Sequence, residues 1–113
     1  MKVTGTNVSM TRGDSESITV TMKNTEGELV PFEDGDLLYF TIKENINTES
    51  KILQKAITIF RDGSALIGIL PEDTKSLRCK EYVYDIQLNR IDGTVSTIIK
   101  PSKFVIEGEV TYE

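Results

Sequence analysis

The sequence predicts an all-β fold. Apolar and polar residues alternate with a period of two in several segments, which is the pattern of a strand with one buried face. Turn-forming residues separate these segments about every ten residues, a spacing typical of sandwich folds. We therefore expect an immunoglobulin-like antiparallel β-sandwich of about seven or eight strands with one short helical turn.

Length and charge limit the organisation and the partners of the chain. It has 113 residues, enough to bury roughly two thirds of its unfolded surface around one core, so we expect a single domain over residues 1–113. The formal net charge is −5, and no basic cluster stands out. Because binding of a nucleic-acid backbone needs such a cluster, we expect no nucleic-acid partner.

The sequence shows no membrane or secretion signal. Its apolar runs are only a few residues long, and the N-terminus has a lone Lys2 without the apolar stretch of a signal peptide. We therefore expect no membrane association and synthesis in the cytoplasm.

Residue types needed for common catalytic sites are missing. The single cysteine, Cys79, has no partner for an internal disulfide, and the sequence contains no histidine. The usual Cys-His and Ser-His arrangements and most zinc sites are therefore excluded. We expect no enzyme, no catalytic residues, no cofactor and no metal site, and we interpret Cys79 as a small residue where a loop meets a strand.

The N-terminal half contains several alternating segments. Ser15–Lys23 and Leu38–Ile42 each alternate as half-buried strands do. Leu53–Phe60 is expected to pair with Ala65–Leu70 through a hairpin at Asp62-Gly63, because Asp-Gly is a strong hairpin signal.

The C-terminal half begins with the one expected helical turn. Pro71–Leu77 places proline at a first helical position and acids directly after it. Glu81–Arg90 alternates again, and Asp92-Gly93 is expected to turn the chain into a strand over Thr94–Lys100. The last strand is expected over Phe104–Tyr112.

The apolar face of each expected strand gives the predicted core. Its members are large side chains at alternate positions, and burial of that face drives folding. They are Ile18, Val20, Phe40, Ile42, Ile57, Ile59, Leu66, Tyr84, Ile86, Leu88 and Phe104.

Two loops invite a functional interpretation. Arg12-Gly13-Asp14 spells the tripeptide that integrins recognise, but a turn is needed directly before the Ser15 strand, and we interpret the motif as that turn. The acidic loop Glu33-Asp34-Gly35-Asp36 has carboxylates that could hold calcium. It lacks the twelve-residue ligand spacing and terminal glutamate of a calcium loop, so a solvated turn is favoured while calcium binding stays open.

Three carboxylates and four tyrosines complete the candidates. Glu72, Asp73 and Asp85 are the best residues for acid-base chemistry, but a helix N-terminus accounts for the first two and an outward strand position for the third. Tyrosine is favoured at interfaces, although packing in a core or across strands is its commoner use. The four tyrosines are Tyr39, Tyr82, Tyr84 and Tyr112.

An ordered set of short segments carries a family resemblance over nearly the whole chain. The segments are Arg12-Gly13-Asp14 before an alternating strand, a turn with Gly27, Phe40–Lys43, Leu70–Thr74, Tyr82–Gln87, Asp92–Val95 with Thr97, and Phe104–Val110 followed by Thr111. Together they resemble the N-terminal domain of phage and prophage baseplate upper proteins and related tail-fibre proteins of bacteria with low-GC genomes.

The resemblance implies a structural role. It implies an immunoglobulin-like module that fastens a larger receptor-binding assembly to a phage tail, with other tail or baseplate proteins as partners and the virion, assembled in the host cytoplasm, as location. Family members commonly continue into coiled-coil or fibre segments that these 113 residues do not include. We therefore expect an adaptor or decoration piece of a phage or domesticated prophage.

Exposed strand edges point to self-association. The expected first and last strands, Val3–Met10 and Phe104–Tyr112, carry few charges and no proline to block pairing with another chain. We therefore expect a homo-oligomer.

The alternative function is a stand-alone ligand-binding or carbohydrate-binding sandwich, although the lack of tryptophan argues against an aromatic sugar platform.

Overall fold

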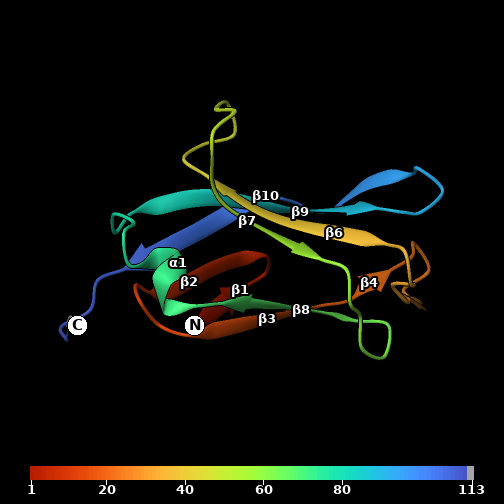
Figure 1. The fold of residues 1–113 in the computed structure, drawn as a ribbon, viewed down its shortest axis with the longest axis horizontal. Coiled ribbons are helices and arrows are strands. Elements are labelled where there is room, and N and C mark those ends of the chain that lie inside the picture. The colour runs from red at the N-terminus through yellow and green to blue at the C-terminus, as the bar shows by residue number, and fades with distance from the viewer. Residues whose placement is uncertain (112–113) are drawn as a thin grey trace.

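The protein is all-β. A computed structural model gives its structure and describes residues 1–111, in which ten strands and one four-residue helix occur (Figure 1). In chain order the elements are β1 (Lys2–Thr4), β2 (Asn7–Thr11), β3 (Glu16–Val20), β4 (Met22–Lys23), β5 (Leu29–Val30), β6 (Leu37–Lys43), β7 (Lys51–Ile57), β8 (Ala65–Ile69), α1 (Pro71–Thr74), β9 (Glu81–Asn89) and β10 (Val95–Glu107).

The strands differ from the expected seven or eight because two expected strands are divided, two are merged and β5 is added. The expectation of separate strands over Thr94–Lys100 and Phe104–Tyr112 is wrong, because the chain bends at a bulge between Ile99 and Ser102 without turning back, so both belong to β10, which ends at Glu107. The expected first strand becomes a β1–β2 hairpin around Gly5, whose φ of 61° allows the reversal. The expected strand Ser15–Lys23 divides at Thr21 into β3 and β4, which belong to different sheets.

The largest sheet has six strands in the order β1-β2-β10-β9-β6-β7. Its neighbours are antiparallel except for β2 and β10, which run parallel over Val8–Thr11 and Phe104–Glu107. The expectation of antiparallel pairing is therefore wrong for this pair. The physical reason is that the two strands are far apart in the sequence, so no tight turn dictates their relative direction.

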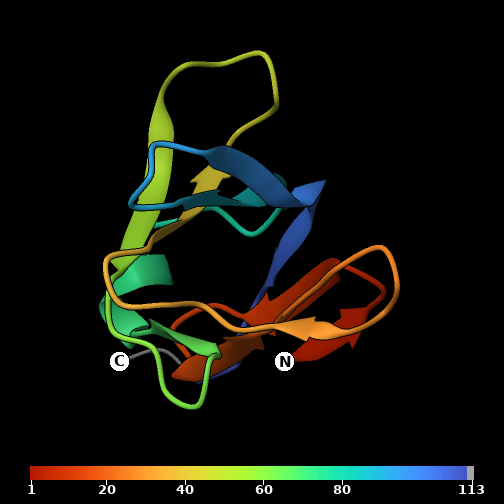
Figure 2. The same cartoon turned by 90° about the vertical axis from the view of Figure 1, so that its right-hand side faces the viewer.

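β10 carries this sheet from one layer of the fold to the other. Its register with β9 shifts between Thr97 and Ile99 and again between Ile99 and Ser102, and such bulges bend a strand. In Figure 1, β9, β6 and β7 lie above, whereas β1 and β2 lie below beside β3 and β8. Figure 2 shows the blue β10 descending between these levels.

Two small sheets complete the fold. β3 pairs with β8, and β4 pairs with β5. The predicted hairpin between Leu53–Phe60 and Ala65–Leu70 is therefore wrong, because β7 pairs with β6 and β8 pairs with β3. The turn itself forms, with Asp62 and Gly63 at φ of 53° and 74°, and it joins a strand of one sheet to a strand of another.

Two local predictions in the C-terminal half are confirmed. The helical turn forms as α1, and its first N–H groups are satisfied in part by Asp73, whose Oδ2 accepts from the Leu70 N–H at 2.8 Å. The Asp92-Gly93 turn connects β9 to β10, with the Arg90 N–H donating to the Thr94 carbonyl at 2.8 Å.

One apolar cluster lies between the layers. Of the predicted core, Val20, Phe40, Ile42, Tyr84, Ile86, Leu88 and Phe104 are buried, and Ile18 and Ile57 are partly buried against them. Three aromatic rings meet at its centre. Phe40 lies 5.4 Å from Tyr84 and 6.0 Å from Phe104 between ring centroids. Tyr84 lies 5.8 Å from Phe104, so each ring contacts both others.

Two core predictions are wrong. Ile59 is 85% exposed because β7 ends at Ile57 and the chain then leaves the sheet. Leu66 is 61% exposed because β8 turns its odd-numbered residues inward. Buried residues that were not predicted include Val8, Met10, Phe32, Leu38, Ala65, Ile67, Ile69, Tyr82 and Ile106.

Truncation of the central ring tests this packing. We expect Phe40→Ala to lower the free energy of unfolding by about 3–5 kcal/mol, because it removes a fully buried ring and leaves a cavity. Ile59→Ala is the matched control and should change it by about 0.5 kcal/mol or less. Urea unfolding measures both, and equal losses would contradict the assigned faces.

Candidate functional site

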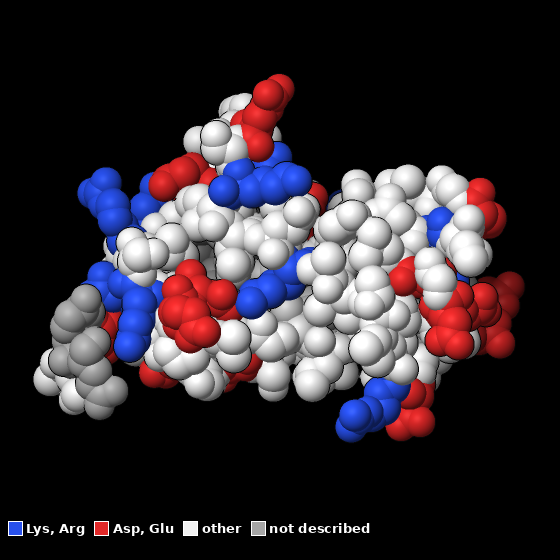
Figure 3. All heavy atoms as spheres, viewed as in Figure 1, with Lys and Arg blue, Asp and Glu red and all other residues white. Residues whose placement is uncertain are grey.

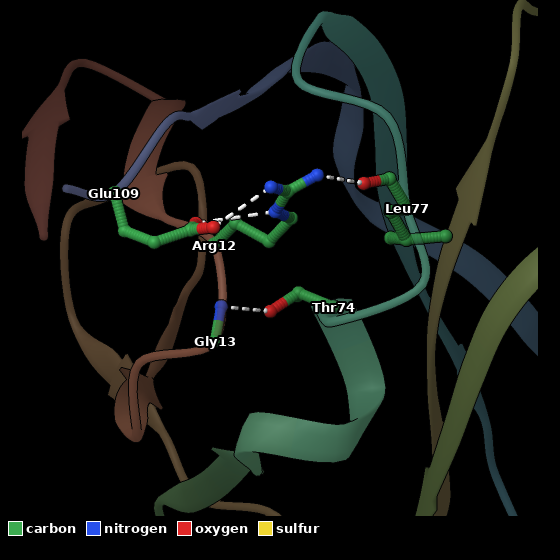
Figure 4. Close-up of polar contacts among 5 residues, drawn as sticks. All are labelled: Arg12, Gly13, Thr74, Leu77 and Glu109. Atoms are coloured by element: carbon green, nitrogen blue, oxygen red, sulfur yellow. Dashed lines mark hydrogen bonds and ion pairs between the residues drawn. The ribbon is translucent and has the colours of Figure 1, made fainter. Parts of the chain in front are cut away.

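Arg12 joins three segments at one end of the fold. Its backbone N–H donates to the Glu107 carbonyl at 2.8 Å, directly after β2 ends. Its guanidinium donates to both carboxylate oxygens of Glu109, at 3.1 Å from Nε and 2.7 Å from Nη2, and to the Leu77 carbonyl at 3.2 Å from Nη1 (Figure 4). These hydrogen bonds hold the pKa of Glu109 below its usual value.

The Arg-Gly-Asp motif is a turn, as predicted. Gly13 has a φ of 84°, and its N–H donates to the hydroxyl of the fully buried Thr74 at 2.8 Å (Figure 4). The Asp14 N–H closes the turn on the Thr11 carbonyl at 3.2 Å. An adhesion receptor would need the guanidinium of Arg12, which this scaffold already engages.

The acidic loop is organised around one buried carboxylate. Asp36 is 2% exposed, and its Oδ2 accepts from the Glu33 N–H and from Arg90, each at 2.9 Å. Gly35, at a φ of 93°, allows the close approach of Ile91. Within residues 1–111, no three side chains of His, Cys, Asp or Glu come together as metal ligands. Asp36 thus joins the loop before β6 to the β9–β10 turn.

Asp73 has a structural place beside α1. Its Oδ2 lies 2.8 Å from the Lys55 Nζ and accepts from the Leu70 N–H at the same distance. Burial raises its pKa, but the hydrogen bonds from Lys55 and Leu70 outweigh burial, so the pKa is lowered. Glu72, its neighbour, is exposed.

Asp85 lies on the other face of the large sheet. It is opposite Thr41, whereas Lys55 is opposite the buried Phe40. The Asp73 carboxylate binds Lys55 and therefore lies on the inner side, so the fold does not bring Asp73 and Asp85 together. The pair lacks the shared site that acid-base catalysis by two carboxylates requires.

The outer face around Asp85 forms a shallow polar hollow. Its volume is about 400 Å³, and β6, β7 and β9 line it with polar side chains. The lining residues are Tyr39, Thr41, Lys43, Lys51, Gln54, Asp85 and Gln87. Gln54 donates to the Thr41 hydroxyl at 3.1 Å, which holds two of these side chains in place.

The tyrosines do not act together on the surface. Tyr82 is buried and donates to the Arg78 carbonyl at 2.8 Å. Tyr84 is buried and donates to the Thr6 carbonyl at 2.5 Å, and burial raises its pKa. An interface role for these two is therefore wrong. Tyr39 lies in the polar hollow, and Tyr112 lies outside the described residues.

The open strand edges differ from those predicted. In the described part of the chain, β1 and β7 are the outer strands of the large sheet, which agrees with an exposed Val3 but not with Met10 or Phe104. Phe104 is wrong as an edge residue because β10 lies between β2 and β9 there. β3 and β8 form a separate two-stranded sheet, and because each pairs only with the other among the described residues, each also has an open edge.

An uncharged groove lies between β1 and β3. Its volume is about 310 Å³, and residues of β1, β2 and β3 line it together with one residue each of β9 and β10. The lining residues are Met1, Val3, Gly5, Thr6, Val8, 17–21, Tyr84 and Ile99. The described lining contains no Asp, Glu, Lys or Arg side chain. The Met1 amino group beside it is paired with Glu16 at 2.9 Å, and that hydrogen bond raises the pKa of the amine.

The groove lies on the side of the fold where β1 and β3 each have an unpaired edge. On the opposite side, β7 and β8 follow each other closely in the chain, and Lys55 of β7 is bound to Asp73 of α1. Figure 2 places β7 and β8 on the left and β1 on the right. The sequence signals that could have located the groove are Gly5, which lies between β1 and β2, and Thr21, which lies between β3 and β4.

Charged side chains surround uncharged areas on the face viewed in Figure 3. Acidic and basic groups cover the left half, the upper projection and the right end of this face and reach its middle, and an area to the right of the middle carries neither. The exposed outer residues of β3 and β8 are likewise uncharged, namely Ser17, Thr19, Leu66 and Gly68.

Comparison with known proteins adds no relative. No protein-family model, no curated protein and no solved structure matches the chain. Across residues 1–111, no helix has the length and apolar character needed to cross a membrane.

The lowered pKa of Asp73 predicts a pH dependence of stability. Its carboxylate favours the native state above its unfolded pKa of about 3.9, and this contribution is lost as the pH falls through the lower native pKa. We expect Asp73→Asn to be less stable than wild type at pH 7 and the difference to shrink at acidic pH. Urea unfolding across a pH series measures it, with Glu72→Gln as control. A difference that persists at low pH would contradict the ion pair as its source.

Proposed function

We propose that the protein is a non-catalytic assembly module of a phage or prophage virion, an adaptor of the baseplate or tail. The observation that carries this proposal is the uncharged groove between two open strand edges, β1 and β3. Open edges are sites of pairing with another chain, and natural proteins protect them unless pairing is used. The family resemblance supplies the class of partner, other tail or baseplate proteins, and the virion as location.

We also propose that the fold is an immunoglobulin-like sandwich. Its support is the single apolar cluster that strands of both layers share, with Phe40 and Ile86 from one layer and Val20 and Ile67 from the other. Strands packed face to face around such a core are the basis of this architecture. The assembly function does not require it, because the groove depends only on the two edges.

The absence of an enzyme activity is part of the proposal. The carboxylates considered for acid-base chemistry do not share a site, since Asp73 is bound to Lys55 on the inner side, Asp85 faces outward, and Glu72 is exposed. A catalytic pair must share one site with the substrate. We further propose that neither nucleic acid nor membrane is a partner, in keeping with the net charge of −5.

The polar hollow favours a second candidate function, carbohydrate binding. Tyr39 offers an aromatic ring, and Thr41, Gln54, Asp85 and Gln87 offer hydrogen-bonding groups suited to sugar hydroxyls. Its weakness is the single ring, because a sugar platform commonly uses larger or several aromatic surfaces. Glycan-array binding that Tyr39→Ala abolishes would favour this function over assembly.

Association measurements test the assembly function. We expect light scattering to show complexes of the protein with itself or with baseplate and tail proteins of a related phage. Val3→Asp should weaken them about tenfold or more, because it places an unpaired charge beside an uncharged groove. Ile59→Asp, at an exposed apolar residue away from the groove, is the control and should have no effect.

A strict monomer that binds none of these proteins would contradict the assembly function. Equal weakening by Val3→Asp and Ile59→Asp would show that general surface apolarity, and not the groove, drives association.

A further inference from the structure

We propose that the polar hollow on the outer face of β6, β7 and β9 binds an acidic oligosaccharide. The anionic group of the ligand lies on Lys43 and Lys51, and one of its sugar rings lies against Tyr39. The inference deepens the carbohydrate-binding candidate and rests on it. It is independent of the assembly function, because the described linings of the hollow and of the groove between β1 and β3 have no residue in common.

The two lysines are a like-charge pair. Lys43 is opposite Lys51 in the antiparallel register of β6 and β7, and both line the hollow. Neither forms an ion pair within residues 1–111, and the Lys51 Nζ donates to the Gln54 Oε1 at 3.4 Å. Like charges opposite each other destabilise a sheet. A ligand anion between the two ammonium groups would remove this repulsion, so the pair points to a negatively charged ligand.

Asp85 confines the negative charge of the ligand to the lysine end. It lies on β9 opposite Thr41, and it forms no ion pair with another side chain in the described part of the chain. A carboxylate repels a second anion but accepts hydrogen bonds from hydroxyl groups. The middle of the hollow therefore suits the neutral, hydroxyl-bearing part of a sugar, with Gln54 and Thr41 already joined beside it.

The hollow is long enough for more than one sugar unit. Tyr39, Thr41 and Lys43 alternate with buried residues of β6 and so share its outer face. At a rise of about 3.3 Å per residue, the Cα atoms of Tyr39 and Lys43 are about 13 Å apart. A single sugar ring against Tyr39 does not reach the lysines, so a ligand that uses both ends is an oligosaccharide.

A smaller hollow continues the site beyond the lysines. Its volume is about 80 Å³, and it shares Thr41, Lys43 and Asp85 with the polar hollow. Ile46 and Pro101 add apolar side chains to its lining. Ile46 comes from the loop between β6 and β7, which rises above the upper layer in Figure 1. These apolar side chains fit the C–H groups of the sugar unit that carries the anion.

A glycan array tests the ligand class. The immobilised saccharides are oligogalacturonides, their methyl esters, phosphorylated malto-oligosaccharides and unmodified malto-oligosaccharides. We expect the protein to bind an acidic class, and the carboxylate and phosphate classes distinguish the source of the anion. The methyl esters and the unmodified chains lack the charge, so we expect them to bind about tenfold or more weakly than their acidic counterparts.

Variants locate the two ends of the site. Lys43→Gln/Lys51→Gln should weaken binding of the acidic ligand about tenfold or more in titration calorimetry and leave binding of its uncharged counterpart unchanged. Tyr39→Ala should weaken both, because the ring contacts the sugar and not the charge. Lys23→Gln/Lys75→Gln removes the same charge from exposed positions outside the hollow, and this matched control should bind as wild type does.

Two further measurements separate a ligand contact from a loss of structure. Removal of the lysine pair relieves a repulsion, so unliganded Lys43→Gln/Lys51→Gln should melt no lower than wild type in circular dichroism. The affinity of wild type for the acidic ligand should fall as salt is added, because salt screens the attraction between charges. The affinity of Lys43→Gln/Lys51→Gln should respond much less.

Three results would overturn the inference. They are equal binding of acidic and uncharged counterparts, equal losses in the two double-lysine variants, and an array on which no saccharide is bound. Binding of uncharged saccharides that Tyr39→Ala abolishes would leave the carbohydrate-binding candidate in place with a neutral ligand, whereas binding of no saccharide would remove that candidate too. Neither result bears on the assembly function, which Val3→Asp tests.

Discussion

The fold depends on how the chain is held at two of the places where it passes between sheets. It leaves the large sheet after β2 to enter β3, and after β8 it re-enters the large sheet through α1 at β9. Arg12 fastens both passages, because its guanidinium binds Leu77 after α1 and Glu109 after β10. Gly13 adds a hydrogen bond to the buried Thr74. Hydrogen bonds between charged groups are stronger than neutral ones, and a bidentate pair also fixes the relative orientation of the two groups.

This arrangement makes the two lateral sides of the molecule unequal. On one side the chain runs directly from β7 to β8, and Lys55 is bound to Asp73 beside it. On the other side, residues of β1 and β3 line an uncharged groove, and within residues 1–111 no strand lies between the two. An inward-pointing lysine protects an edge from pairing, whereas an uncharged edge invites it. The proposed assembly function follows from this difference.

Most of the polar residues considered as candidates for a catalytic or binding site instead form hydrogen bonds and ion pairs that connect loops and strands of the fold. Asp36 joins its loop to Arg90, Asp73 supports α1, and Arg12 organises the turn that spells an adhesion motif. Tyr84 lies in the aromatic centre and reaches Thr6 with its hydroxyl. Polar groups that are bonded in this way stabilise one arrangement of the loops, because leaving any of them unpaired in a buried place is costly.

The sequence alone determined the all-β character, the helical turn at α1 and the inward face of β6 and β9, because a long alternating strand admits only one choice of buried face. The Asp62-Gly63 turn was also predictable from the sequence, but the strands beside it do not pair with each other, because β7 pairs with β6 and β8 pairs with β3. A tight turn reverses the chain locally and does not decide which sheet each strand joins. In Ala65–Ile69 the residues on both faces are small or apolar, so only pairing with β3 decided that Ile67 is buried and Leu66 exposed. The groove likewise required the tertiary structure, because β1 and β3 become neighbours only through contacts between distant segments.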